Sequence, residues 1–274
     1  MDKVILVAEI GINHNGDLDV AKQLIREAKA CGCDYVKFQK RTVNKVYSEE
    51  YLSKYRESPW GETNKAQKLG LEFETTEYNI INNYCKEQEI KWFASPWDVD
   101  SVLFLNNYIP PFIKIASACI TNFDLLYAIK MTGKPVIMST GMSTKEEVKK
   151  AVDYLSNQIE YLLACTSTYP TKDEDMNLNF IKTLKKEFPK YKIGFSNHSA
   201  GIFFASVAPI LGAEMIEFHT TLNRAMYGSD QAASIELVGQ VRLIKYVRAL
   251  EKALGTGEWI ITDGEKEIRN KLRK

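Results

Sequence analysis

Three histidines are the side chains of this sequence best suited to acid–base or metal chemistry, and each follows an apolar run typical of a buried strand. His14 follows VILVAEIGIN, His198 ends YKIGFSNH and His219 ends EMIEFH. In a parallel barrel the carboxyl ends of the strands meet at one edge, where active sites form. A lone histidine there is usually a hydrogen-bonded structural group, whereas three out of three indicate a functional site.

His198 and His219 are expected at the ends of neighbouring strands, about 4.8 Å apart, so that both imidazoles can converge on one ion. Nitrogen ligands combined with a carboxylate and open water positions suit manganese, zinc or iron(II). Asp230 or Glu9 could supply the carboxylate oxygen. Two histidines that act as general acid and base without a metal are the alternative.

Lys37 and Lys114 lie inside runs that otherwise read as buried strands, YVKFQK and FIKIAS. Because an isolated buried ammonium group is costly, two lysines pointing into a barrel mouth need an anion. Serine hydroxyls at the ends of several runs add hydrogen-bond donors: Ser95, Ser117, Ser139 and Ser196. Together they predict a pocket for phosphate and carboxylate, hence a phosphorylated small acid. A Schiff-base lysine is the rival role for one of the two, although a metal beside them makes it less economical.

The elements that must position these side chains alternate regularly along the chain. Eight runs rich in Val, Ile and Phe read as strands buried on both faces, at residues 4–10, 35–40, 91–95, 112–117, 135–140, 161–167, 191–196 and 214–220. Eight alternations with helices predict an α/β fold, a (β/α)8 TIM barrel, in a single domain spanning 1–274. The competing open, doubly wound sheet would need a GxGxxG turn, and none follows the first strand.

Amphipathic stretches between these runs predict the helices. The stretch 18–32 ends on Gly32, a C-cap signal, and 144–158 opens with Thr144 and Glu147 at capping-box spacing. The stretch 234–255 predicts a long final helix closed by its glycine.

One connection is much longer than the others. About 35 residues, roughly 41–75, follow the second strand before its helix, and they are polar and aromatic with Pro59-Trp60-Gly61 among them. Long loops in compact domains are often lids or binding loops, and a surface decoration is the equal alternative.

Composition excludes several classes of partner and compartment. The 274 residues carry 36 Lys+Arg against 35 Asp+Glu, so no basic excess favours nucleic acid or an anionic membrane. The start, MDKVILVAEIG, lacks the basic region and uninterrupted apolar core of a secretory signal, and no run approaches the roughly 18 apolar residues of a membrane span. Five scattered cysteines, an odd number, predict a reduced, cytoplasmic protein, and a single CGC pair is weak evidence for a metal or redox site.

Seven motifs at the predicted strand ends resemble, in order, the barrel domain of the N-acetylneuraminate (sialic acid) synthases: AEIGINHNG, VKFQ, IKIAS, STGM, CTSTYP, GFSNHS and EFHTTL. The match runs from about residue 5 to 265. The resemblance implies a transferase that condenses phosphoenolpyruvate with the open-chain aldehyde of an aldose, N-acetylmannosamine or a related sugar. The product would be a nonulosonic or related 3-deoxy-2-keto acid, with phosphate released by C–O cleavage.

The same resemblance implies a role for each matching residue. The family metal, usually manganese, matches His198 and His219, where it would polarise the aldehyde oxygen. Glu9 would handle protons on the attacking water or the sugar oxygen, Asp230 aligns with an aspartate near the metal water, and Tyr169 with a sugar-contacting tyrosine. The phosphoenolpyruvate contacts are Lys37, Lys114, Ser95, Ser117, Ser139 and Ser196, and the two lysines count with Glu9 and Asp230 as catalytic. Gln39 is a further expected substrate-binding residue.

Three departures from the family pattern bear on the acceptor sugar. Cys119 stands where the family often has a glutamate that meets the amino sugar, and Ser167 replaces an asparagine of the sixth-strand motif. The sequence stops at DGEKEIRNKLRK, where typical members continue into a small antifreeze-like domain that reaches across a dimer. We therefore expect an acceptor that is not necessarily N-acetylmannosamine, or a site completed by a homodimer or by a separate capping protein.

Two other functions are compatible with parts of the pattern. A class II-type aldolase or sugar epimerase would share the metal and the histidines, but it would not need the two-lysine anion pocket. A catalytically idle barrel that serves as a sugar-binding or scaffold subunit would explain Cys119 and the missing domain. Intact lysines, histidines and Glu9 argue against such decay.

Overall fold

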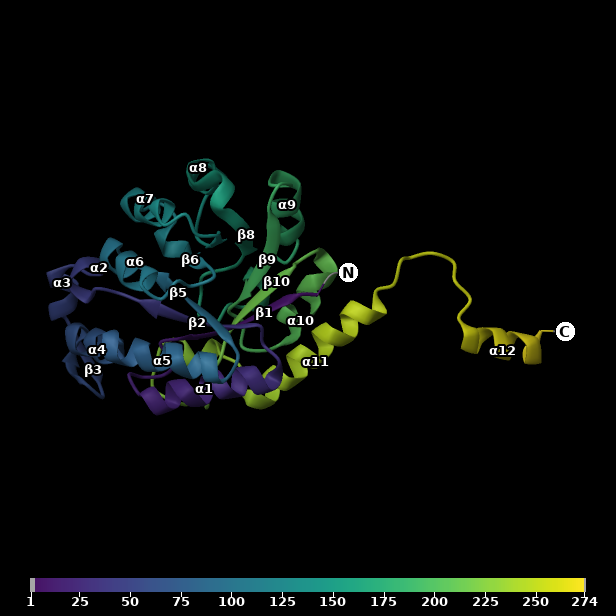
Figure 1. Cartoon of the computed structure of the whole chain (residues 1–274), viewed down its shortest axis with the longest axis horizontal. Coiled ribbons are helices and arrows are strands. Elements are labelled where there is room, and N and C mark those ends of the chain that lie inside the picture. The colour runs from purple at the N-terminus through teal and green to yellow at the C-terminus, as the bar shows by residue number, and fades with distance from the viewer. Residues whose placement is uncertain (1–2, 274) are drawn as a thin grey trace.

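Eight parallel strands close into a barrel in the computed structural model, which describes residues 3–273 (Figure 1). The strands are β1 (Ile5–Gly11), β2 (Tyr35–Lys40), β5 (Lys91–Pro96), β6 (Ile113–Ile115), β7 (Val136–Ser139), β8 (Ile159–Ala164), β9 (Lys192–Asn197) and β10 (Met215–His219). Their order around the barrel is β1-β10-β9-β8-β7-β6-β5-β2. The predicted (β/α)8 fold is confirmed.

All eight predicted strands are present, and their bounds differ from the prediction by three residues or fewer. The largest difference is at β8, which was expected to reach residue 167 and ends at Ala164. Residues 165–167 leave the barrel wall there and begin the loop that carries several of the site residues at the carboxyl end of the strand.

The interior of the barrel changes character along its axis because successive residues of a strand point to opposite faces. Near the amino ends of the strands the interior is filled by an apolar cluster, called the apolar layer below: Val7, Phe93, Phe112, Ile137, Tyr161, Leu163 and Met215. Two residues further along several of these strands, the same face carries polar side chains instead. A larger apolar cluster lies between the barrel and its helices, so the strands are buried on both faces.

The helices that follow the strands form the outer ring of the barrel (Figure 1). They are α1 (Leu18–Cys31), α5 (Thr75–Glu87), α6 (Val99–Asn106), α7 (Phe123–Met131), α8 (Lys145–Leu155), α9 (Phe180–Glu187), α10 (Phe203–Val207) and α11 (Leu237–Ala253). Short 3-10 turns lie at Ser117–Cys119, Ser156–Gln158, Asp173–Asp175, Ala208–Leu211 and Gln231–Ala233.

Capping residues set both ends of α1 and the start of α8, and the sequence predicts Gly32 and the Thr144–Glu147 pair among them. The Asp17 side chain accepts hydrogen bonds from the first amides of α1, which ends at Gly32 with a φ of 94°. Thr144 and Glu147 form the predicted capping box of α8. Both helices then turn one apolar face toward the barrel, made in α1 by Ala21, Leu24, Ile25 and Ala28.

The long connection after β2 is folded. Residues 41–74, called the insertion below, contain α2 (Val43–Val46), α3 (Glu49–Ser53), the antiparallel pair β3 (Tyr55–Ser58) and β4 (Gly61–Thr63), and α4 (Asn64–Leu71). Trp60 anchors it: a side chain at Gly70 would fall 2.1 Å from the Trp60 ring. The Trp60 ring also lies 5.7 Å from the ring of Tyr227, whose hydroxyl donates to the Glu57 carbonyl at 3.3 Å. The insertion therefore reaches over to the loop that follows β10.

Beyond α11 the chain leaves the barrel and forms one more helix, α12 (Asp263–Leu272), which stands apart from the rest in Figure 1. The sequence predicted α11 as the last helix, closed by Gly255, and it ends at Ala253. The side chains of residues 254–273 are exposed. Among the helices of the described chain, none combines the length and the apolar character that crossing a membrane requires.

Candidate active site

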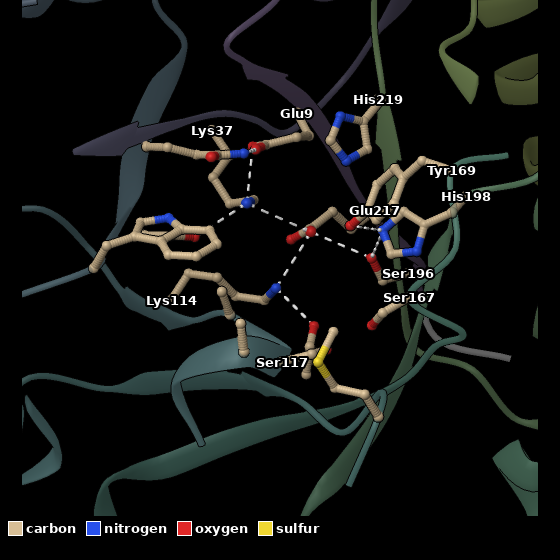
Figure 2. A pocket seen from close by; sticks show the side chains of 17 residues that line it. Glu9, Lys37, Lys114, Ser117, Ser167, Tyr169, Ser196, His198, Glu217 and His219 are labelled. Atoms are coloured by element: carbon tan, nitrogen blue, oxygen red, sulfur yellow. Dashed lines mark hydrogen bonds and ion pairs between the residues drawn. The ribbon is translucent and has the colours of Figure 1, made fainter. Parts of the chain in front are cut away.

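A cavity of about 140 Å³ opens at the carboxyl ends of the barrel strands (Figure 2). Its walls are Glu9, Lys37, Gln39, Ser95, Trp97, Lys114, Ala116, Ser117, Ala118, Ser139, Met142, Ser167, Tyr169, Ser196, His198, Glu217 and His219. The structure thus brings together the residues predicted for the site, with the exception of His14, Cys119 and Asp230. The predicted set comes from all eight strands or the loops that follow them.

Strand alternation explains why these side chains converge. On β5, Phe93 belongs to the apolar layer and Ser95, two residues later, lines the cavity. Met215 and Glu217 are related in the same way on β10. Because the side-chain period of a strand is two, each strand places an apolar residue below and a polar residue above on the same inner face.

Two lysines and two glutamates form a buried network on the cavity floor, called the ionic layer below: Glu9, Lys37, Lys114 and Glu217. Lys37 Nζ lies 2.9 Å from Glu9 Oε2 and 3.5 Å from Glu217 Oε1. Lys114 Nζ lies 3.3 Å from the same Glu217 oxygen and donates to Ser139 Oγ at 2.7 Å. Figure 2 shows Glu217 between the two lysines. The anion that buried lysines require is therefore supplied in part by the protein itself.

The surroundings of the two lysines move their pKa values in opposite directions. Burial lowers the pKa of Lys114, and the single carboxylate of Glu217 only partly offsets it, while the charge of Lys37 adds to the lowering. Burial also acts on Lys37, but Glu217 and Glu9 outweigh it and raise the pKa of Lys37. Burial alone would raise the pKa of Glu217, and the nearby Lys114 and Lys37 reverse this and lower it. The shifts thus favour the charged forms of Lys37 and Glu217, whereas the shift of Lys114 favours its neutral form.

Glu217 is the functional candidate that the sequence analysis missed. It was placed at the end of the eighth strand but was given no role. The signal was its position two residues before His219, which puts both side chains on the inner face of β10. Trp97, Met142, Ala116 and Ala118 also line the cavity and were not predicted.

His198 and His219 end the neighbouring strands β9 and β10, and their ring centres lie 5.5 Å apart. His198 Nδ1 lies 2.6 Å from the Thr166 carbonyl oxygen, so it donates its proton there and Nε2 carries the lone pair. That lone pair accepts a hydrogen bond from the Tyr169 hydroxyl at 3.0 Å. Burial and the neighbouring imidazole of His219 lower the pKa of His198 to about 3, so the ring is neutral.

These features fit a metal ligand, because a metal-bound imidazole must be neutral and usually donates its other nitrogen to a carbonyl or carboxylate. Within residues 3–273 no group of three or more His, Cys, Asp or Glu side chains is arranged to hold an ion. The chain would therefore offer two imidazoles, from His198 and His219, and leave the other positions to water or substrate.

Neither carboxylate proposed as an oxygen ligand joins the two imidazoles. Glu9 is held by Lys37 and by Gln39, whose Nε2 donates to Glu9 Oε1 at 2.7 Å. Asp230 lies outside the cavity, with its Oδ2 3.6 Å from Nδ1 of His219. Asp230 therefore lies beside the imidazole of His219, and its expected place near the metal water stays a prediction.

Two further residues singled out in the sequence do not line the cavity. Cys119 is buried in the outer apolar core rather than in the cavity, because the 3-10 turn Ser117–Cys119 points its first two side chains inward and its third outward. His14, the third histidine of the predicted trio, also lies outside the cavity. Its ring stacks on Phe73 at 4.0 Å, and its Nδ1 accepts from the Gly16 amide. Burial lowers the pKa of His14 to about 3, as expected for a structural histidine.

Comparison with known proteins gives a consistent family match. The model described as the NeuB family matches residues 24–259. The N-acetylneuraminate-9-phosphate synthase of Homo sapiens is 38% identical, over 98% of this chain and 76% of that protein. The N,N'-diacetyllegionaminic acid synthase of Campylobacter jejuni is 34% identical, over 100% of this chain and 84% of that protein.

A solved structure matches the whole chain. The crystal structure of N-acetylneuraminic acid (sialic acid) synthetase from Leptospira borgpetersenii serovar Hardjo-bovis, in complex with citrate, superposes with a TM-score of 0.85. The two sequences are 32% identical, and the match covers 100% of this chain and 93% of that one.

Proposed function

Because the chain belongs to the NeuB family, we propose that it is a synthase that condenses phosphoenolpyruvate with the open-chain aldehyde of an aldose. The product is a nonulosonic or related 3-deoxy-2-keto acid, and phosphate is released. The observation that carries the proposal is one cavity in which two buried lysines and a set of serine hydroxyls face two imidazoles. This arrangement suits an anionic donor on the floor and a carbonyl acceptor at the side.

The floor of the cavity would hold phosphoenolpyruvate. Lys37 and Lys114 supply positive charge, and hydroxyls beside them supply neutral donors: Ser95, Ser117, Ser139 and Ser196. Lys37 already donates to Ser95 Oγ at 3.2 Å, so the lysines and hydroxyls lie within reach of one ligand. Glu217 contacts both ammonium groups and keeps them facing the cavity before the ligand arrives.

The aldehyde would lie at the imidazole side. His198 and His219 would hold a divalent ion, manganese by the family resemblance, and this ion supplies Lewis-acid polarisation of a carbonyl oxygen. His198 is fixed by its bond to the Thr166 carbonyl, and His219 Nδ1 lies 3.6 Å from Asp230 Oδ2. The exposed ring of Tyr169 stands over both imidazoles, where it would contact the sugar chain.

The chemistry requires one carbon–carbon bond and one water molecule. The enol C3 attacks the aldehyde carbon, and water adds to C2 of the donor. The C2–O bond to phosphate then breaks, leaving a 2-keto acid. One proton of the water protonates the former aldehyde oxygen, which becomes a hydroxyl, and the other proton leaves with phosphate. Glu9, which is held in place by Gln39 and Lys37, is the carboxylate suited to accept and return such a proton.

A phosphate-release assay tests the proposal. The protein is incubated with manganese, phosphoenolpyruvate and single aldoses, including N-acetylmannosamine and its 6-phosphate, and inorganic phosphate is measured. We expect release that depends on one class of aldose and that is lost in Lys114→Ala. The matched control is Lys192→Ala, which removes a lysine from the exposed amino end of β9. Cleavage or epimerisation of sugars without phosphoenolpyruvate would contradict the proposal and favour an aldolase or epimerase.

A further inference from the structure

Gln39 joins the Glu9 carboxylate in the cavity to a buried arginine outside it. Its Nε2 donates to Glu9 Oε1 at 2.7 Å, and its Oε1 accepts a hydrogen bond from Nη2 of Arg41. Arg41 follows β2 directly and is the first residue of the insertion. Three side chains thus form one chain of hydrogen bonds, which leads from the insertion to the carboxylate that handles protons in the proposed function.

The two ends of this chain permit a single orientation of the Gln39 amide. A guanidinium can only donate hydrogen bonds, and an ionised carboxylate can only accept them. An amide between the two therefore turns its oxygen to Arg41 and its NH2 group to Glu9. Without the arginine, the amide is free to rotate, and Glu9 loses the fixed donor at its Oε1.

A glycine on β1 provides the space in which Gln39 and Glu9 meet. Gly11 has a φ of 54°, and a side chain there would fall 2.9 Å from Glu9 Oε1 and 3.0 Å from Gln39 Nε2. The register between β1 and β2 also shifts between Glu9 and Gly11. The backbone of β1 is therefore shaped so that the amide and the carboxylate can lie in contact.

Glu9 is held at both of its oxygens. Oε1 accepts from Gln39, and Oε2 lies 2.9 Å from Nζ of Lys37. Lys37 precedes Gln39 by two residues on β2, so both side chains point from this strand toward the cavity. These two contacts restrict the rotation of the carboxylate and fix the direction of its remaining lone pairs. A group that transfers a proton needs this fixed direction because the rate depends on its position relative to the reacting atom.

The insertion in turn holds Arg41. Glu72, directly after α4, lies with its Oε1 3.4 Å from Arg41 Nη1, and its Oε2 accepts from the Arg41 amide at 3.0 Å. The guanidinium carbon lies 4.4 Å from the centre of the Trp97 ring. Arg41 is 8% exposed, so water competes little for its hydrogen bond to Gln39. One planar guanidinium thus connects the insertion, through Glu72, to the site, through Gln39.

We infer that Arg41 is a positioning residue for Glu9, acting through Gln39, and that the insertion holds it in place. The inference rests on the proposed function for the task of Glu9, whereas the orientation of the Gln39 amide is independent of that function. The insertion then acts on the reaction from outside the cavity, because it holds the carboxylate rather than the substrate.

A double-mutant cycle on the condensation tests the inference. We expect Arg41→Met to lower kcat about tenfold and to change KM for phosphoenolpyruvate by less than about twofold, because Lys37 and Lys114 stay in place. In a Gln39→Met background the chain of hydrogen bonds is already broken, so adding Arg41→Met should change kcat by less than about twofold. An unchanged kcat in Arg41→Met, or a loss that is as large in the Gln39→Met background, would overturn the inference.

Lys40→Met is the matched control. Lys40 is buried beside the same Glu72, with its Nζ 3.6 Å from Oε2, so each variant leaves Glu72 with one cation. Because Lys40 follows Gln39 on the strand, it points to the opposite face of β2, where it donates to the Phe73 carbonyl at 2.8 Å. Thermal unfolding of both variants compares their stability. If Lys40→Met lowers kcat as much as Arg41→Met does, the effect comes from the packing of the insertion and the inference is wrong.

A measurement without substrates separates this inference from the proposed function. The Gln39 side-chain NH2 gives a pair of signals in 1H–15N NMR, which are assigned by their absence from Gln39→Met. Arg41→Met should speed the exchange of these protons with water about tenfold, and Lys40→Met should leave it unchanged. If no aldose consumes phosphoenolpyruvate, the proposed function fails, while the NMR result still decides whether Arg41 holds the amide. Equal exchange rates in wild type and Arg41→Met would show that it does not.

Discussion

The barrel interior has two layers that share their strands and their burial but differ in chemistry. The apolar layer, near the amino ends, contains Phe93, Phe112 and Met215. Each of these lies two residues before a polar side chain that lines the cavity. The ionic layer above holds Lys37, Lys114, Glu9 and Glu217, which are as fully buried as the aromatic rings below them. Comparing the two layers therefore shows how the same degree of burial affects the stability of apolar groups and of charged groups.

Burial of the apolar layer lowers the free energy of the folded protein, whereas burial of the charges in the ionic layer raises it. Removing apolar surface from water is favourable in proportion to its area. Moving a charge out of water is costly, and a buried ion pair often returns no more than it costs. We conclude that the apolar layer contributes to the stability of the barrel, whereas the ionic layer is kept for binding.

The strongest test removes one ion pair from the ionic layer. In the double variant Lys114→Met/Glu217→Gln, the Glu9–Lys37 pair stays intact, so no buried charge is left alone. We expect phosphate release to fall about a thousandfold because the donor loses a cation on the cavity floor, while the unfolding midpoint stays equal or rises. Phosphate-release kinetics and thermal unfolding measure the two effects. A large loss of stability together with retained activity would reverse the assignment of the two layers.

The converse test empties part of the apolar layer. Phe93→Ala should cost about 3 to 5 kcal/mol in the free energy of unfolding, because it leaves a cavity that the barrel cannot fill. Donor affinity, measured well below the unfolding midpoint, should change little. Phe203→Ala, which truncates an exposed phenylalanine on α10, is the control and should cost less than about 0.5 kcal/mol. If the two variants are equally stable, the apolar layer does not carry the stability assigned to it.

The pH dependence of stability tests the burial of two histidines, His198 in the cavity and His14 outside it. The pKa of His198 falls from 6.5 to about 3 on folding, so between these values the unfolded state binds a proton that the folded state does not. Stability should therefore decrease as the pH falls from 6.5 toward 3, and His198→Asn should reduce this slope by about 1 kcal/mol per pH unit. Urea unfolding in the presence of a chelator measures it.

His14 provides a second test of this slope at a position outside the cavity. Its pKa is lowered to about 3 by burial as well, but it packs on Phe73 outside the cavity. His14→Asn should flatten the pH dependence by a similar amount and leave phosphate release nearly intact. An unchanged slope in both variants would mean that neither ring is held neutral by the fold.

The same contrast shows what the sequence could reveal. The eight strands and the inward direction of Lys37, Lys114 and the serines follow from local rules, namely runs of buried residues and a period of two. His14 could not be placed, because its partner Phe73 lies in the insertion and meets it only after folding. Cys119 was misplaced because a 3-10 turn breaks the strand alternation. The role of Glu217 was missed because its partners come from two other strands.

The smallest expected effect concerns Tyr169, at the border between the ionic layer and solvent. Its hydroxyl donates to His198 Nε2 at 3.0 Å, which is the lone pair that a metal ion would need. Metal binding therefore has to break this hydrogen bond, which is worth about 1 kcal/mol. Tyr169→Phe keeps the ring and removes the competitor, so manganese should bind about fivefold more tightly. Calorimetric titration with manganese, without substrates, measures the change independently of any contact between Tyr169 and the sugar. Weaker binding in this variant would show that the hydroxyl supports the ion instead, and His198 would then offer its lone pair only together with Tyr169.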